Sequence, residues 1–589
     1  MIVLGISGLP HAQDYLARTT PGLTPEDERI CQGLDSAAAI VVDGKLVAAA
    51  SEERFNGDKG TGRLPVNAIA YCLQAAGIGP SDVQAIAHGF NYDRVKRAFV
   101  RSPEYFNEVL TGRTVIDALT GAGWADVSFR FQPVEHHRAH AASAYFPSGF
   151  ESALCVVADG MGETESLSVY RGSGTQLEKL YSQSISSSLG LLYSICTRFL
   201  GFQFNSDEYK VMGLAAYGDP TRYRAVFEKL AHFDPASGGI KVNWPRGCLS
   251  DAERGYPQAR SYLRSLTFTP RPPDGQVHQE EADLAAALQA RLTELLVELV
   301  GYWLDETGES NLCLAGGTFL NCKSNQSIAE LPAVRQMFVQ PAAGDDGTSI
   351  GAALEVANKH GDRYVGPLAG FDPYTGPSYT AQEIRQELEA RGSGAGISWK
   401  YLGLGEEYFA AAADDLARDQ IIGWFHGRME FGPRALGNRS ILGLPRGERI
   451  KERINELVKF REPFRPFAPA VLEEDCHTLF ETRALAPTSY MLCTARVREE
   501  HRESVSGVVH ADGSARIQVV RRDLNEAFWT LLSHVKERTG TGCAVNTSFN
   551  VKGQPLIMSP GTAIDTFNRT SLTRLYIEGF IVWKTSLSL

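Results

Sequence analysis

The sequence predicts an α/β protein built from two large domains, and three observations carry this prediction. The chain has 589 residues, more than one hydrophobic core usually supports. Residues 2–48 and 154–172 share one plan, in which an apolar strand, a turn with an acid and a glycine, and a second strand follow one another. A segment rich in glycine, proline and tyrosine at 362–379 then precedes fresh helical patterns. We therefore expect domains over 1–370 and 371–589.

The elements of the first domain follow from this plan. The opening segment MIVLGISG predicts a strand, and 186–202 and 284–304 predict core helices. Residues 311–315 predict a strand that turns through two glycines into a helix, and 344–361 a helix of small side chains. Two facing strand–turn–strand units are similar to the nucleotide-binding halves of the actin, sugar-kinase and Hsp70 superfamily. We therefore expect an actin-like (ASKHA) domain, a duplicated ribonuclease-H-like fold.

The second domain is also predicted to be α/β. Its helical patterns lie at 380–392, 406–419 and 448–459, and its strand candidates lie at 420–425, 467–472, 515–520 and 542–546.

The stretch WFHGRMEFGPRALGNRSI, residues 424–441, follows neither the helical nor the strand period. Arg428, Arg434 and Arg439 alternate there with glycines. Guanidinium groups bind phosphate or carboxylate oxygens, and glycines let backbone N–H groups approach the same anion. The pattern favours an anion-binding cradle, whereas a solvated basic loop would leave Phe431 and Leu436 exposed.

Composition excludes several classes of function. A net charge of -11 and a pI near 5.7 argue against a nucleic-acid coat. The 10 cysteines form no C-x-x-C pair, so common zinc-ribbon spacings are absent and a cytoplasmic protein with reduced thiols is expected. The chain start lacks the basic region of a signal peptide, and 284–304 carries charges, so no membrane anchor is expected.

Four residues form a candidate metal site. His136 and His140 lie four residues apart, which places both on one face of a helix with Cβ atoms about 5 to 6 Å apart. Asp159 at the end of a strand and Asp345 before a helix are expected to converge on the same cleft, while His137 is expected to point elsewhere. Histidine and carboxylate without thiolate suit iron, manganese or zinc. The alternative is a pair of histidines satisfied by the core.

Several long motifs identify a resemblance. RMEFGPRALGNRS, KFREPFRPFAP, HADGSARIQVV and NTSFNVKGQP resemble the carboxyl-terminal half of the O-carbamoyltransferases that modify antibiotics and nodulation factors. DGKLVAAASEERF, EHHRAHAASAYFPS, EYKVMGLAAYG and LAGGTFLNCKSN resemble the amino-terminal half. The resemblance implies a carbamoyl-transfer domain similar to tRNA threonylcarbamoyl transferase, with Fe(II) as the usual metal. It implies a YrdC-like carboxyl-terminal domain that makes carbamoyl adenylate from carbamoyl phosphate and ATP with Mg²⁺.

The resemblance also implies site residues. In the carboxyl-terminal domain the ATP and carbamoyl phosphate site would comprise Arg428, Arg434, Lys459, Arg465, Arg516, Asn546, Ser548 and Asn550. Arg428 and Arg439 could instead pair with nearby acids such as Glu430 and Glu452. In the transfer domain the nucleotide or carbamoyl adenylate would lie on Gly160, Gly316, Gly317 and Asn321.

The catalytic assignment departs from the family pattern His-Asp-Ala-Ser-Ala. His11 stands at the expected distance from the first strand, but Asp35 follows only after an insertion of roughly two dozen residues, and Leu34 precedes it. We expect His11 and Asp35 to meet across this excursion, with His11 as the base or orienting group. The alternative is that the motif histidine is lost. The insertion is expected to shape the acceptor pocket.

The predicted activity is O-carbamoylation of a small-molecule natural product, as in antibiotic biosynthesis. A hydrogenase-maturation carbamoyltransferase would carry C-x-x-C pairs and an acylphosphatase module, and a tRNA-threonylcarbamoylating enzyme fits the acidic composition poorly. A non-catalytic nucleotide-binding regulator would not need the intact metal and arginine sets. The acceptor hydroxyl and the oligomeric state, including a homodimer, stay open.

Overall fold

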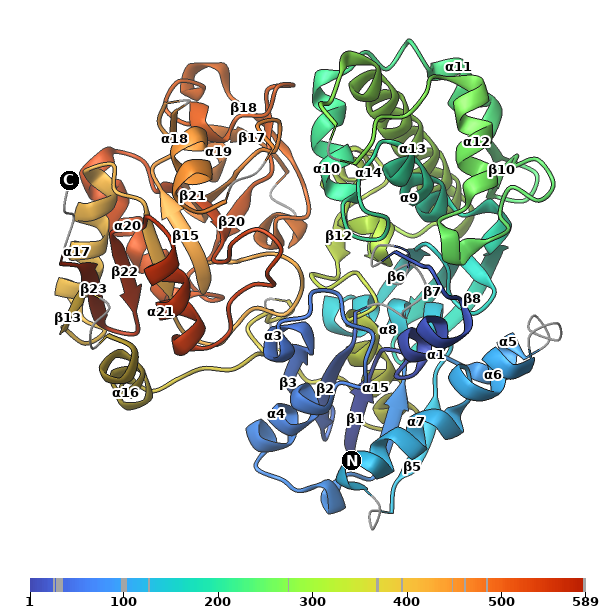
Figure 1. Cartoon of the computed structure of the whole chain (residues 1–589), viewed down its shortest axis with the longest axis horizontal. Coiled ribbons are helices and arrows are strands. Elements are labelled where there is room, and N and C mark those ends of the chain that lie inside the picture. The colour runs from blue at the N-terminus through green and yellow to red at the C-terminus, as the bar shows by residue number, and fades with distance from the viewer. Residues whose placement is uncertain are drawn as a thin grey trace. The chain divides into compact units, whose positions relative to one another are not determined.

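The computed structural model describes residues 1–24, 27, 35–96, 103–124, 128–273, 275–366, 370–392, 396–447, 449–459, 462–483 and 486–585 (Figure 1). Part of the insertion between His11 and Asp35, residues 25–26 and 28–34, lies outside the described residues. The chain divides into two compact units, Met1–Asn56 with Gly60–Phe371, and Gly57–Lys59 with Asp372–Leu589.

The first unit contains two five-stranded sheets with the same topology. One has the order β3 (Lys45–Ser51), β2 (Ala37–Val42), β1 (Ile2–Ile6), β4 (Ala85–His88), β5 (Arg130–Pro133). The other has the order β8 (Gln176–Ser184), β7 (Glu165–Ser173), β6 (Ser152–Ala158), β11 (Asn311–Ala315), β12 (Gln336–Val339). In each sheet the first three strands of the chain pair antiparallel and the next two pair parallel. The predicted duplication is confirmed.

Two helices lie back to back between these sheets. α15 (Gly347–Lys359) packs on β1, β2 and β4, α8 (His136–Ser148) packs on β6 and β11, and the two helices pack on each other. Glycine permits the close approach, because a Cβ on Gly351 would lie 1.7 Å from the carbonyl oxygen of Ala139 in α8. A Cβ on Gly5 of β1 would similarly meet the carbonyl oxygen of Ser349 at 1.9 Å. These contacts fix the two helices that carry the candidate metal site.

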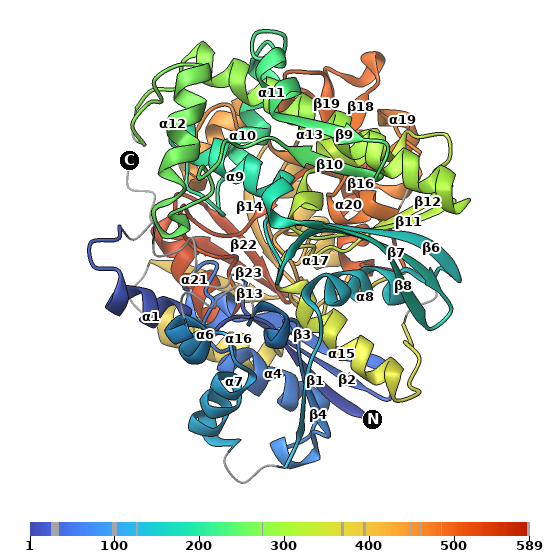
Figure 2. The same ribbon diagram turned by 90° about the vertical axis from the view of Figure 1, so that its right-hand side faces the viewer.

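Further helices complete the first unit (Figure 2). The first sheet is accompanied by α1 (Ala12–Thr19), α3 (Glu53–Asn56), α4 (Val66–Ala76), α5 (Tyr92–Val95), α6 (Pro103–Val109) and α7 (Gly112–Leu119). A helical subdomain holds α9 (Leu189–Phe199), α10 (Glu208–Leu214), α11 (Arg224–Leu230), α12 (Pro257–Leu266), α13 (Gln279–Thr307), α14 (Cys322–Ala329) and the hairpin of β9 (Ala231–Asp234) and β10 (Gly239–Val242).

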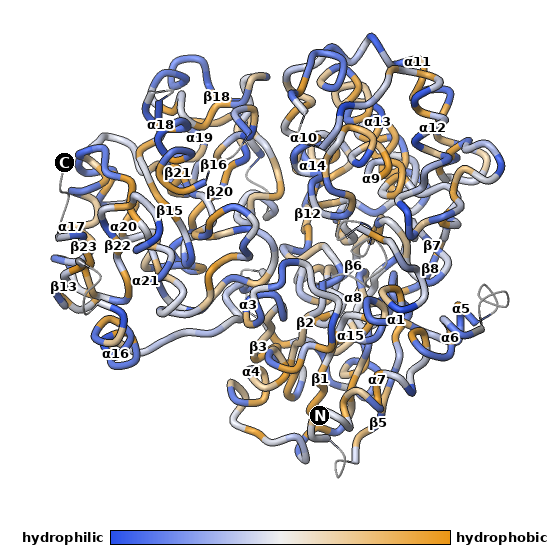
Figure 3. The backbone as a smooth tube through the Cα atoms, in the orientation of Figure 1, coloured by the Kyte–Doolittle hydropathy of each residue, from blue (hydrophilic) through white to orange (hydrophobic). Residues whose placement is uncertain are grey.

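Apolar residues gather along α13 and along β1 to β3 (Figure 3). Among the described residues, no helix has both the length and the apolar character that a membrane span needs.

The second unit is built on a mixed eight-stranded sheet. Its order is β13 (Ile397–Tyr401), β23 (Phe580–Lys584), β22 (Arg574–Ile577), β14 (Ile422–Phe425), β15 (Arg439–Gly443), β21 (Cys543–Ser548), β16 (Ala468–Leu472), β20 (Gln518–Val520). Strand alternation sends Ile422 and Trp424 to a core shared with α17 (Glu406–Ala417) and α20 (Glu526–Thr539). Phe425 belongs to a separate core with α16 (Ala381–Gly392) and α21 (Pro560–Arg569). The predicted α/β class is confirmed for this unit.

Two predicted elements of the second unit differ from the structure. The helix predicted at 448–459 ends early, as α18 (Arg449–Ile454), and Asn455–Lys459 forms a wider π-type turn that lets the Lys459 ammonium reach Ser548. The strand predicted at 515–520 splits into β19 (Ser514–Ala515) and β20, because the chain passes there from a small sheet into the large one. The small sheet also holds β17 (Phe480–Glu481), next to α19 (Glu473–Leu479), and β18 (Ala495–Val497).

Candidate functional site

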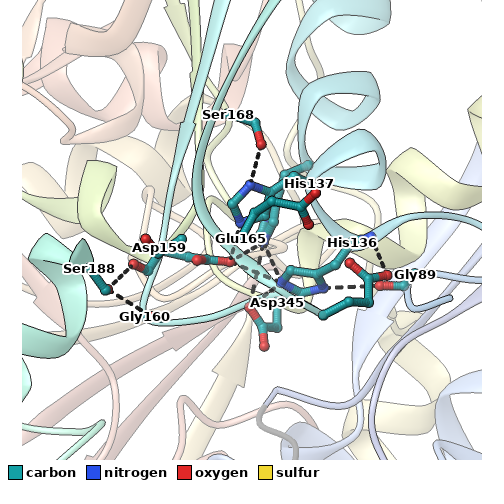
Figure 4. A network of polar contacts seen from close by, with 12 residues as sticks. Gly89, His136, His137, Asp159, Gly160, Glu165, Ser168, Ser188 and Asp345 are labelled. Atoms are coloured by element: carbon teal, nitrogen blue, oxygen red, sulfur yellow. Dashed lines mark hydrogen bonds and ion pairs between the residues drawn. The ribbon is translucent and has the colours of Figure 1, made fainter. Parts of the chain in front are cut away.

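Four predicted metal ligands converge in the first unit. One ligand atom from each of His136, His140, Asp159 and Asp345 lies within 4.8 Å of the others. The Nε2 atoms of His136 and His140 are 3.1 Å apart, and Asp345 Oδ1 lies 3.5 Å from both. Asp159 Oδ2 lies 3.2 Å from His136 Nε2 (Figure 4). The expected convergence of these residues is observed.

Three element ends bring these side chains together. α8 begins at His136, so His140 follows one turn later on the same face. β6 ends at Ala158, directly before Asp159, and Asp345 precedes the first turn of α15. The side chain of Asp345 is 36% exposed whereas that of His140 is fully buried. The cluster is therefore open to solvent on the Asp345 side, where a substrate could approach.

The hydrogen bonds of His136 favour metal binding. Its Nδ1 donates to the carbonyl oxygen of Gly89 at 3.0 Å, so in neutral His136 the lone pair sits on Nε2, which faces the cluster (Figure 4). Burial lowers the pKa of His136, but the carboxylates of Asp345 and Asp159 outweigh burial and raise this pKa well above its ordinary value. A metal cation bound in the cluster would neutralise the negative charge of the same two carboxylates.

Asp159 provides the test of whether a cation fits. Its side chain is 5% exposed; Oδ2 faces the Nε2 atoms of His136 and His137 at 3.2 and 3.1 Å, and Oδ1 has no hydrogen-bond partner among the described residues. Burial raises the pKa of Asp159, yet His137 and His136 outweigh it and hold this pKa well below its ordinary value. A buried charged carboxylate is costly unless it is paired or coordinated. The two imidazoles and two carboxylates therefore fit a divalent metal such as iron, manganese or zinc.

His137 lies outside the four-residue group, as predicted, but its ring contacts one member of the group, Asp159. Its Nδ1 lies 2.8 Å from Ser168 Oγ on β7, and its Nε2 lies 3.1 Å from Asp159 Oδ2 (Figure 4). Adjacent residues on a helix differ by about 100° in direction, and β7 with the Asp159 turn occupies that second direction. His137 thus links Asp159 to Ser168 on β7. In the sequence, the adjacent pair of His136 and His137 at the start of a helix was the feature that could have indicated this contact.

The residues expected to hold a nucleotide in this unit have mixed roles. Gly316 has φ 96°, and a Cβ there would lie 2.2 Å from the carbonyl oxygen of Ala158, so glycine is required. Gly317 and Gly160 have open space where a Cβ would lie. Asn321 is the N-cap of α14, where its Oδ1 accepts from Ser324 N and its Nδ2 donates to Gln289 Oε1. The Asn321 amide is thus bonded within the protein.

The two expected catalytic residues lie in separate turns. His11 is half-buried at the start of α1, and its carbonyl oxygen accepts from Tyr15 N. Asp35 has φ 52°, and its carbonyl oxygen accepts from Ser7 Oγ at 2.8 Å. Its Oδ2 lies 3.3 Å from the position of a Cβ on Gly344, the residue before Asp345. Asp35 therefore lies beside the loop of the metal cluster, while its pairing with His11 stays a prediction.

In the second unit, three of the predicted residues meet. The Lys459 side chain is buried, and its ammonium donates to Ser548 Oγ at 3.2 Å and to Asn550 Oδ1 at 2.7 Å. It also donates to the Asn550 carbonyl oxygen at 3.0 Å. Asn546 lies deeper, donating to Gln518 Oε1 at 2.7 Å and to the Ala435 carbonyl oxygen at 3.2 Å. Lys459 thus orders the turn after β21.

Two arginines of the 424–441 loop, Arg439 and Arg428, donate to backbone carbonyl oxygens of the protein. Arg439 is fully buried, its guanidinium carbon lies 3.6 Å from the centre of the Phe425 ring, and it donates to His426 and Pro377 carbonyl oxygens. Arg428 donates to the carbonyl oxygens of Thr375 and Gly376.

Glu430 is not an ion-pair partner in these contacts. Its Oε1 accepts from the backbone N–H groups of Leu436, Asn438 and Arg439. Arg439 therefore holds the loop together from inside through carbonyl oxygens, which favours the structural one of the two roles left open for it. Of the other predicted cations, Arg434 and Arg516 are half-buried. Arg465 forms an ion pair with Glu462, with 3.4 Å between Nη1 and Oε2.

Comparisons with known proteins cover both units. The family model described as Carbamoyltransferase N-terminus matches residues 32–354, and that described as Carbamoyltransferase C-terminus matches residues 413–584. An uncharacterized protein of Synechocystis is 37% identical, covering 94% of this chain and 95% of its own. Nodulation protein NolNO of Sinorhizobium fredii is 36% identical, covering 94% and 79%. Nodulation protein NolO of Bradyrhizobium diazoefficiens is 39% identical, covering 77% and 80%.

Solved structures give weaker matches. HypF from T. kodakarensis has a TM-score of 0.30 at 13% identity, covering 62% of this chain and 50% of its own. A ROK hexokinase from Thermus thermophilus has a TM-score of 0.30 at 13% identity, covering 61% and 100%. These likenesses are faint, and the duplicated fold of the first unit is seen directly in its two sheets.

Proposed function

The chain belongs to the carbamoyltransferase family and is a carbamoyltransferase, and from this premise we propose that it is an ATP-dependent O-carbamoyltransferase. It makes carbamoyl adenylate from carbamoyl phosphate, ATP and water, releasing phosphate and pyrophosphate, and it transfers the carbamoyl group to a hydroxyl of a small-molecule natural product. The observation that carries the proposal is the cluster of His136, His140, Asp159 and Asp345, which lies within the part of the chain matched by the amino-terminal model.

The proposal divides the two steps between the two units. The amino-terminal unit, with its duplicated sheets, performs the transfer as an actin-like domain. The carboxyl-terminal unit, with its mixed eight-stranded sheet, forms the adenylate as a YrdC-like domain. This division is supported by the chemistry of the side chains, because polyanions need cations and the second unit supplies the arginine-rich loop.

In the second unit, Arg434, Arg465 and Arg516 are the cations proposed to bind the phosphates of ATP and carbamoyl phosphate. Lys459 has a different role, since its ammonium is already bonded to Ser548 and Asn550. It positions these two side chains for the nucleotide and adds a positive charge beneath them. Arg428 contributes mainly by holding the loop, through its bonds to the backbone of Thr375 and Gly376.

In the first unit, the Gly316–Gly317 turn is proposed to receive the nucleotide part of the adenylate. His11, or His11 with Asp35, takes the proton of the acceptor hydroxyl, whose oxygen then attacks the carbamoyl carbon and displaces AMP. A divalent metal held by the four-residue cluster, with Fe(II) proposed and Mn²⁺ or Zn²⁺ as alternatives, would supply Lewis-acid chemistry. Asp159 and Asp345 would hold it with the two histidines.

The test is direct. Purified protein is incubated with ATP, Mg²⁺, carbamoyl phosphate and a panel of hydroxyl-bearing natural products, and products are identified by mass spectrometry. We expect one acceptor class to gain a single carbamoyl group only when both ATP and carbamoyl phosphate are present. Release of pyrophosphate from ATP should depend on carbamoyl phosphate even without an acceptor. If neither product nor this dependence is found, the proposal is wrong and a nucleotide-binding regulator becomes the better interpretation.

A further inference from the structure

We propose that Glu163 is a positioning residue for the candidate metal centre, acting by fixing the helix that carries both histidines. The inference rests on the proposed metal-dependent transfer. Glu163 is 4% exposed and does not belong to the four-residue cluster. No sequence pattern singled it out, because its role depends on contacts with two distant segments.

Glu163 caps α8 from outside the helix. Its Oε1 accepts from the backbone N–H of His136, the first residue of α8, at 2.8 Å. Glu135, the residue in the N-cap position, makes no capping bond with its own side chain. The first N–H groups of a helix lack partners within the helix, and its positive end favours a carboxylate. Glu163 therefore provides the cap that the local sequence does not.

The same oxygen also holds the turn that orients the His136 ring. Glu163 Oε1 accepts from the backbone N–H of Asn91 at 2.7 Å. Two residues earlier in that turn, the carbonyl oxygen of Gly89 accepts from His136 Nδ1 at 3.0 Å. One carboxylate oxygen thus ties the backbone of His136 to the segment that bonds its ring, which leaves Nε2 directed at the cluster.

The loop that carries Glu163 is the loop that begins with Asp159. Its path is constrained, because a Cβ on Gly162 would lie 3.2 Å from His136 Cδ2 and 3.1 Å from His137 Cδ2. The backbone N–H of Gly162 donates to the Glu165 carbonyl oxygen at 2.8 Å. Glu163 therefore connects three pieces of the site: the Asp159 loop, the start of α8, and the turn after β4.

A positioning role can be separated from a purely electrostatic one. Glu163→Gln keeps an acceptor oxygen and removes the charge, whereas Glu163→Ala removes both. Glu281→Ala is the matched control, since Glu281 is 3% exposed and its Oε2 accepts from the backbone N–H of His278 at 2.8 Å at the start of α13. It removes a buried helix cap in the same unit without touching residues of the cluster.

The experiment has two readouts on the full-length protein. The first is titration with Co²⁺, followed by its visible absorption. The second is hydrogen–deuterium exchange of metal-free protein over residues 134–140. For Glu163→Ala we expect Co²⁺ binding about 10-fold to 100-fold weaker, as for other residues that support metal ligands. Exchange over 134–140 should be about tenfold faster, the effect of one lost hydrogen bond. Glu163→Gln should stay within a few-fold of wild type in both readouts, and Glu281→Ala should change neither.

Each other outcome overturns the inference. If Glu163→Gln and Glu163→Ala weaken Co²⁺ binding equally while exchange over 134–140 stays at the wild-type rate, Glu163 acts by charge alone. If Glu281→Ala has the same effect as Glu163→Ala, the change is a general loss of stability. If wild-type protein binds no Co²⁺, the metal-dependent function itself fails, and the inference fails with it. In that case, faster exchange over residues 134–140 in Glu163→Ala would show that Glu163 stabilises the start of α8 and has no role in metal binding.

Discussion

Replacing Gly351 with alanine is predicted to abolish metal binding although Gly351 is not a ligand. Gly351 lies on α15 where this helix contacts α8. A Cβ there would lie 1.7 Å from the Ala139 carbonyl oxygen and 2.8 Å from the Ser143 backbone nitrogen. Both atoms belong to the backbone of α8 on either side of His140, so no side chain can turn away to make room.

The size of the effect follows from these distances. Cβ atoms essentially never approach another heavy atom below 3.0 Å, so α8 and α15 must separate by at least about 1.3 Å. His140 Nε2 and Asp345 Oδ1, which the two helices carry, are 3.5 Å apart and would move towards about 5 Å. Two ligands at about 2.1 Å from one ion can be at most about 4.2 Å apart. Overpacking also costs about 1 to 3 kcal/mol of folding stability.

The assay is elemental analysis of purified protein after equilibration with Fe²⁺ or Mn²⁺, with circular dichroism to show that the variant is folded. Gly301→Ala is the control, because Gly301 lies within α13 and a Cβ added there would have no heavy atom within 4 Å. It should keep its metal and gain up to about 1 kcal/mol of stability. Folded Gly351→Ala protein with wild-type metal content would refute the reasoning.

Three further predictions concern other parts of the chain. Arg434→Ala should lose a charge-assisted contact and slow carbamoyl adenylate formation about 30-fold to 1000-fold, measured as pyrophosphate release, and wild-type turnover would remove Arg434 from the site. His11→Ala should slow transfer about 100-fold to 10,000-fold in a single-turnover assay while the adenylate accumulates, whereas a change of a few-fold would mean a loop histidine without a catalytic role. Burial raises the pKa of Glu208 from 4.5 to about 7, so the folded protein binds a proton that the unfolded chain has lost between these values. Its stability should therefore fall by up to about 3 kcal/mol as pH rises from about 4.5 to about 7. Glu208→Gln should lack this fall in denaturant titrations at pH 5 and pH 8, and parallel pH profiles for the two proteins would contradict the assignment.

The elements that sequence predicts well are those with a strong local signal. The two strand–turn–strand units, α9 and α13 were predicted because long apolar runs end at acids and glycines. The spacing of His136 and His140 predicts their common face, and their meeting with Asp159 and Asp345 follows from strand and helix ends.

The elements that sequence predicts poorly depend on neighbours distant in the chain. Arg439 pairs in register with Phe425 on the adjacent strand, which places its guanidinium over that ring and away from an anion. His137 faces Asp159 only because β7 runs beside α8. Glu163 lies 27 residues from His136 in sequence yet caps its helix. Spacing along one element carries no information about such contacts.

The proposed function assigns the metal cluster to the transfer step and the formation of carbamoyl adenylate to the second unit. It is tested most directly with His140→Ala, carbamoyl phosphate labelled in the carbamoyl group, and ATP. We expect this variant to lose its metal, to form labelled carbamoyl adenylate at the wild-type rate, and to deliver almost no label to the acceptor. Equal loss of adenylate formation and transfer, or stoichiometric metal in the variant, would contradict it.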